Sequence, residues 1–92
     1  MSMLRAVAWG MVDLKKIPID EAYTIKRTIR NELEHHGLWV GGCDRYSREK
    51  SGRTSGECYS LTQFKVGDRT HPRLHAGTFE GCCRAALRII EP

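Results

Sequence analysis

The segment from residue 20 to residue 36 constrains the fold more than any other part of the chain. Its apolar side chains recur at steps of three and four residues, at Ala22, Ile25, Ile29 and Leu33. That spacing places them on one side of an α-helix. Asp20 is a favourable N-cap residue, and Gly37 suits the left-handed residue that ends many helices. The sequence therefore predicts an amphipathic helix over 20–36.

A second amphipathic helix is predicted at the C-terminal end, beginning after Thr78 as its N-cap. Its apolar face consists of Phe79, Cys82, Cys83, Ala86, Leu87 and Ile90. Gly81 is unfavourable in a helix by about 1 kcal/mol relative to alanine, which indicates close packing at the first turn. Two such helices need an apolar surface to share.

Strands can supply that surface. "LWVGGCDRY" and "ECYSLTQFKVG" have strand composition and are joined by a turn-rich connector, so they predict an antiparallel pair. A third short strand is expected around 73–76. Residues 4–12 are predicted to form a first strand, since Val7, Trp9 and Met11 alternate with smaller residues. At 92 residues the chain is one domain, 1–92. The predicted class is α+β, two amphipathic helices on a small mostly antiparallel sheet, in the order β-α-β-β-(β)-α.

An apolar strand at the edge of a sheet invites pairing with another chain, because its backbone groups are unpaired. Val7, Trp9 and Met11 are therefore the candidate residues of a dimer edge. A small core also gains from a second copy. We expect a homodimer as the oligomeric state.

The connector "RYSREKSGRTSGECYS", residues 45–60, is rich in charge and glycine. It lacks the order of a nucleotide-phosphate loop and leads into a strand rather than a helix. Its basic side chains can still contact nucleic-acid phosphates through charge. With 15 Lys and Arg against 11 Asp and Glu, the net charge of +4 permits such a partner without requiring one. The candidate anion-binding residues are Arg45, Arg48, Lys50, Arg53, Lys65 and Arg69.

Metal binding and catalysis have little support in the sequence. Cys58, His71 and His75 match half of a zinc-finger spacing, and Cys43 is the remaining candidate ligand. The second cysteine that should lie two to four residues from Cys58 is missing. Cys82 and Cys83 lie on or beside an apolar stripe, where thiols are usually inert. We expect no cofactor and no catalytic residue.

No stretch approaches the roughly 20 apolar residues that span a bilayer. The apolar N-terminal run lacks a small-residue cleavage site, so it is interpreted as structure rather than a signal peptide. These features predict a cytoplasmic protein without membrane association, whose four cysteines are reduced. Export would instead permit a disulfide pair.

The run "HPRLHAGTFEGCCRAALRIIE", residues 71–91, resembles the ending of small phage-derived proteins described as ABA-sandwich domains. In these a Pro-containing loop leads into a helix with a Cys-Arg-Ala-Ala-Leu-like centre. The resemblance implies an origin in a phage or other mobile element and a layered helix–sheet fold. The order helix, strands, helix also resembles the double-stranded-RNA-binding domain, but "TFEGCCR" replaces the lysine cluster that opens its last helix.

Together these features predict a small non-catalytic binding protein that takes a protein partner or a small ligand between sheet and helices. The alternative is a nucleic-acid-binding module that uses the basic hairpin connector.

Overall fold

The computed structural model describes residues 2–42, 59–64 and 73–92. In this part of the chain three helices accompany a three-stranded antiparallel sheet. The helices are α1 (Met3–Ala8), α2 (Ile19–Glu34) and α4 (Phe79–Ile90), and the strands are β1 (Leu38–Gly42), β2 (Tyr59–Gln63) and β3 (Arg73–Gly77). The predicted α+β class is confirmed. No helix in the described ranges is both long and apolar enough to cross a membrane.

The sheet has the order β1-β2-β3, so β2 is its centre. Val40 on β1 lies opposite Leu61 on β2, which in turn lies opposite His75 on β3. The register between β2 and β3 shifts by one residue after Leu61. Both predicted strands of the antiparallel pair and the short third strand are thus present.

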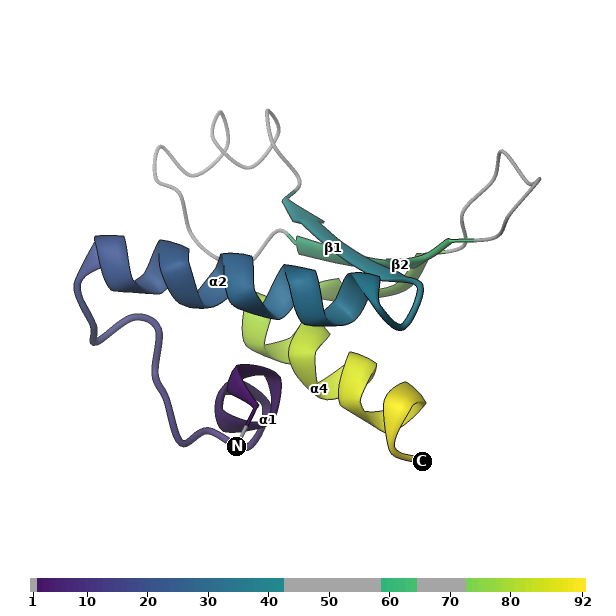
Figure 1. Ribbon diagram of the computed structural model, residues 1–92, viewed down its shortest axis with the longest axis horizontal. Helices are drawn as coiled ribbons and strands as arrows, with labels where there is room; N and C mark the ends of the chain where they lie inside the picture. The colour runs from purple at the N-terminus through teal and green to yellow at the C-terminus, as the bar shows by residue number, and fades with distance from the viewer. Residues whose placement is uncertain (1, 43–58, 65–72) are drawn as a thin grey trace.

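Helices α2 and α4 lie on the same face of the sheet (Figure 1). Leu38, Val40 and Leu61 point toward them and are fully buried, whereas Trp39, between two buried neighbours, is 38% exposed. This alternation is typical of a sheet with one buried face. None of the described elements covers the other face, which carries Trp39.

Helix α2 confirms the predicted amphipathic helix, with different ends. Ala22, Ile29 and Leu33 are buried on its inner side. The N-cap is Pro18 rather than Asp20, and Asp20 lies in the first turn, where its charge suits the helix dipole. At the other end Gly37 has a φ of 71°, and its N–H donates to the Glu34 carbonyl. The left-handed glycine turns the chain directly into β1.

Helix α4 begins as predicted. The Thr78 hydroxyl accepts a hydrogen bond from the Gly81 N–H at 2.9 Å. A Cβ added at Gly81 would lie 3.0 Å from Thr78 Oγ1 and 3.1 Å from His75 Nε2. The absence of a side chain at Gly81 therefore lets the first turn approach β3 closely.

The predicted first strand over 4–12 is wrong, because residues 3–8 form helix α1. The Ser2 hydroxyl accepts from the Arg5 N–H and caps the helix. Leu4, Val7 and Ala8 are buried at helical spacing, against α4 and α2. The Arg5 guanidinium forms a two-bond ion pair with the Glu91 carboxylate just beyond α4.

The dimer edge assigned to Val7, Trp9 and Met11 loses its basis with that strand. Val7 is fully buried, while Trp9 and Met11 are 57% and 60% exposed, so the three side chains do not share a face. The segment forms no sheet edge. The alternation of large and small residues in the sequence reflects the end of a helix followed by the glycine turn at Gly10, where φ is 76°.

Candidate ligand-binding pocket

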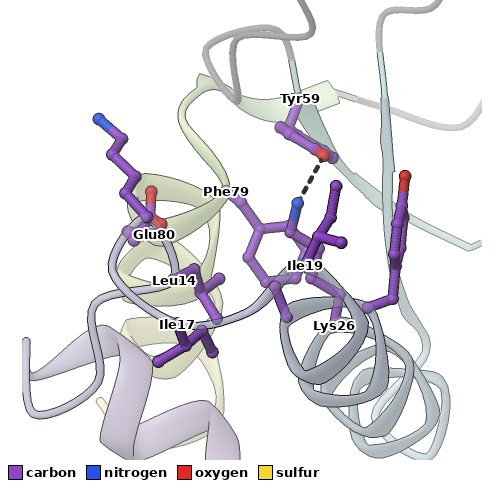
Figure 2. A pocket seen from close by; sticks show the side chains of 10 residues that line it. Leu14, Ile17, Ile19, Lys26, Tyr59, Phe79 and Glu80 are labelled. Carbon is purple, nitrogen blue, oxygen red and sulfur yellow. Dashed lines mark hydrogen bonds between the residues drawn. The ribbon is translucent and has the colours of Figure 1, made fainter.

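A pocket of about 400 Å³ opens between helix α2, the loop that precedes it, and the beginnings of β2 and α4 (Figure 2). Its lining combines apolar side chains with two tyrosines and three charged groups. The lining residues are Leu14, Lys15, Ile17, Ile19, Ala22, Tyr23, Lys26, Tyr59, Phe79 and Glu80. The pocket therefore joins segments that are far apart in the sequence.

The loop between α1 and α2 forms one wall. Asp13 orders a turn there, because its carboxylate accepts from the Lys15 N–H and its carbonyl accepts from the Lys16 N–H, each at 3.0 Å. Asp side chains commonly stabilise turns in this way. Leu14 becomes buried as a result, while Lys15 and Lys16 are exposed. Together with buried Ala22 and Phe79, Leu14 makes a wall that is continuous with the core.

Lys26 supplies a positive charge at the aromatic side of the pocket. Its Nζ donates a hydrogen bond to the Tyr59 hydroxyl at 3.1 Å. It also lies 5.3 Å from the centroid of the Tyr59 ring, 5.5 Å from that of Phe79 and 6.0 Å from that of Tyr23. Tyr59 and Phe79 meet edge to face, with centroids 5.3 Å apart. These contacts hold the ammonium in place through cation–π attraction.

No carboxylate in the described part of the chain pairs with Lys26. Across residues 2–42, 59–64 and 73–92 the one ion pair is Arg5–Glu91, which joins α1 to the end of α4. There the Arg5 hydrogen bond and charge lower the pKa of Glu91. Glu80 is the acidic residue among the described lining residues, and in the view of Figure 2 it is drawn apart from the Lys26–Tyr59 pair. Among the described lining residues the charges are thus those of two lysines and one glutamate.

The anion-binding residues predicted from the sequence fall outside the described residues. This applies to Arg45, Arg48, Lys50, Arg53, Lys65 and Arg69. Of the candidate metal ligands, Cys43, Cys58 and His71 also fall outside, and His75 lies half-buried on β3. Within the described ranges, no group of three or more His, Cys, Asp or Glu side chains could hold a metal ion.

Cys82 and Cys83 are buried on the inner face of α4. Burial, with smaller contributions from Cys82 and Glu80, raises the pKa of Cys83 to about 12. The Cys83 thiol is therefore protonated at neutral pH, and the thiolate, which is the nucleophilic form, is not populated.

The sequence alone does not reveal the pocket. Lys26 lies outside the apolar positions of the predicted helix over 20–36, and Tyr59 lies within the predicted strand "ECYSLTQFKVG". One local signal was available, since Tyr23 and Lys26 are three residues apart on a predicted helix and must be neighbours. The contacts of Lys26 with Tyr59 and Phe79 depend on the tertiary fold.

No protein-family model matches the chain, and searches of curated proteins and of solved structures also find no match.

Proposed function

We propose that this protein is a small non-catalytic binding protein that holds a small, mainly apolar ligand in the pocket between α2, β2 and α4. The observation that carries the proposal is the pocket itself. Its volume of about 400 Å³ falls within the roughly 300–1,000 Å³ that ligand pockets occupy. A largely apolar lining with a few placed polar groups is also typical of such sites.

The burial of part of the pocket wall supports this function. Leu14, Ala22 and Phe79 belong to the same buried cluster as the side chains under the sheet. Tyr59 is held by the sheet and by Phe79. A ligand would therefore enter a preformed site and lose little free energy to ordering the protein.

The test uses Nile red, an uncharged apolar dye whose fluorescence rises in an apolar site. We expect saturable enhancement by the wild type. Ile19→Arg should weaken dye binding by about tenfold, because it places a charge in the lining at a side chain that is 69% exposed and tolerant of change. Ile89→Arg is the matched control, on an exposed part of α4 that does not line the pocket. The proposal would be contradicted if the wild type showed no saturable dye binding, or if Ile19→Arg and Ile89→Arg weakened dye binding equally.

A second candidate function is nucleic-acid binding, favoured by the face of the sheet that none of the described elements covers. Trp39 lies across Gly41, where an added Cβ would come within 2.9 Å of its indole Nε1. The ring of Phe64 lies 6.5 Å from that of Trp39. Arg73 is opposite Thr62, the neighbour of Trp39 in the register. Exposed aromatic rings can stack on bases, and the net charge of +4 favours phosphates.

Gel retardation of single-stranded and double-stranded oligonucleotides at low and high salt tests this second function. Binding should weaken steeply with salt. Trp39→Ala should reduce binding more than Trp9→Ala, an exposed tryptophan on the helical side, and Lys65→Gln with Arg69→Gln tests the predicted basic residues. No retardation at low salt would remove the nucleic-acid function.

We further propose that the protein is a homodimer, that it is cytoplasmic, and that it originates from a phage or other mobile element. The proposed origin rests on the resemblance of residues 71–91. Exposed Trp9 and Met11 offer apolar surface for self-association. Light scattering over a range of concentrations would exclude the dimer if the mass stays that of one chain.

A further inference from the structure

We infer that the ligand of this pocket is a monocarboxylic acid with an apolar body, whose carboxylate pairs with Lys26. The inference rests on the proposed function, because it names the chemical class of the ligand in the same site. Its basis is the placement of an ammonium group, without a carboxylate partner among the described residues, beside apolar walls.

Within residues 2–42, 59–64 and 73–92, Lys26 has hydrogen-bonding capacity to spare. An ammonium group has three donors, and among the described residues its hydrogen bond goes to the Tyr59 hydroxyl. The three rings lie around Nζ and attract its charge, but the rings themselves accept no conventional hydrogen bond. An anionic oxygen at this point would gain a charge-assisted hydrogen bond at the edge of an apolar region, where such bonds are stronger than in water.

Tyr59 adds a second donor at the same point. Its phenolic oxygen accepts from Lys26 Nζ at 3.1 Å, and a phenol that accepts a hydrogen bond can still donate its own O–H, for which the described residues provide no acceptor. Figure 2 shows the Lys26 amine between Tyr59 and Phe79, so the ammonium and the phenol converge on one position. Two adjacent donors match the two oxygens of one carboxylate.

The remaining lining sets what the rest of the ligand can be. Leu14, Ile17 and Phe79 offer contact to hydrocarbon but no hydrogen bond from their side chains. Glu80 also lines the pocket, apart from the Lys26–Tyr59 pair (Figure 2). A second negative charge on the ligand would meet Glu80, and like charges repel. The site therefore favours one anionic group over two.

Three ligands of equal chain length test the inference: decanoate, decanol and decanedioate, each used below its micelle concentration to displace Nile red. Decanoate should displace the dye at about tenfold lower concentration than decanol, the size of effect that a hydrogen bond to a charged group produces. Decanedioate should bind more weakly than decanoate, and Glu80→Gln should narrow that difference.

Variants at the anion position complete the test. Lys26→Met keeps an unbranched apolar stem and should remove the preference for decanoate over decanol. Lys16→Met, at an exposed lysine that does not line the pocket, is the matched control and should keep the preference. Tyr59→Phe keeps the ring that contacts Phe79 and removes one donor, so it should weaken decanoate several-fold and leave decanol unchanged. It serves as the second test if Lys26→Met does not fold.

The outcomes separate this inference from the proposed function. The monocarboxylate assignment would be overturned if decanoate and decanol displaced Nile red equally well, or if the preference for decanoate survived both Lys26→Met and Tyr59→Phe. Saturable binding of Nile red would still uphold the pocket in that case. If Nile red did not bind, or if Ile19→Arg left its binding unchanged, both the pocket function and the monocarboxylate assignment would be overturned.

Discussion

Cys83 lies on the inner face of α4, and its side chain is fully buried in the hydrophobic core. Desolvation is the largest reason that its pKa rises to about 12. In the unfolded chain the thiol would ionise at an ordinary pKa of about 8.5. The folded state therefore keeps a proton that the unfolded state releases in alkaline solution.

This difference predicts that stability falls as the pH rises through the unfolded pKa of Cys83. The loss should approach about 1.4 kcal/mol per pH unit between the unfolded and folded values, because unfolding releases one proton in that range. Urea unfolding at about pH 8 and about pH 10.5 measures it. The wild type should lose about 2 kcal/mol more than Cys83→Ala, in which this thiol is absent. Equal losses in the two proteins would contradict the buried, protonated thiol.

The roles of some single residues could be predicted from the sequence, and those of others could not. The unfavourable helix propensity of Gly81 indicated close packing, and the 3.1 Å approach of a virtual Cβ to His75 confirms it. Gly37 was correctly predicted as a helix-ending residue, because its role depends on local backbone geometry. The role of Lys26 could not be predicted, since its hydrogen-bond partner Tyr59 is 33 residues away in the sequence.

At the level of elements, α1 is the part of the fold that sequence periodicity did not predict. The nine residues 4–12 are apolar at most positions, so they satisfy both a two-residue and a 3.6-residue period. A short helix is marginal in isolation and is stabilised by packing. Here the stabilising contacts come from α4 and from Glu91, 86 residues from Arg5. Long-range contacts therefore decide the conformation of this segment.

Two substitutions distinguish the helix from the strand that the alternating pattern indicated. Leu4 is 1% exposed in α1, so Leu4→Ala should lower the free energy of unfolding by about 2–5 kcal/mol. Trp9 is exposed just after the helix, and Trp9→Ala should cost less than about 1 kcal/mol despite the larger deletion. Chemical denaturation measures the free energy of unfolding of both variants, and the comparison is valid where their m-values equal that of the wild type. The reverse ranking would favour an arrangement in which Val7, Trp9 and Met11 share a face.

For the whole molecule, the order of the last five elements could be predicted from the two amphipathic helices. The apolar face of each helix must be buried against another element. The three strands supply one apolar surface for the faces of both α2 and α4. The pocket required more information. Its outline depends on how the loop around Leu14 lies against Phe79, and the composition of that loop indicates only a break between elements.

The same architecture predicts where the fold is most resistant to opening. Strand β2 has a neighbouring strand on each side and α4 packed against it, whereas β1 and β3 each have one paired edge in the described sheet. Amide hydrogens of β2 that bond within the sheet should exchange only through near-global unfolding. Hydrogen exchange followed by mass spectrometry or NMR measures this. Exchange of β2 as fast as that of β3 would show that the sheet opens from its centre.

Because every helix of the described fold lies on one side of the sheet, the two sides can accept mutations to different extents. Replacing Leu38 or Leu61 disturbs the interior, while replacing half-buried Thr62 or exposed Arg73 mainly alters what the outer surface offers to other molecules. Lineages that share this interior are free to diversify the outer surface. One scaffold can in this way acquire new binding specificities while its stability changes little.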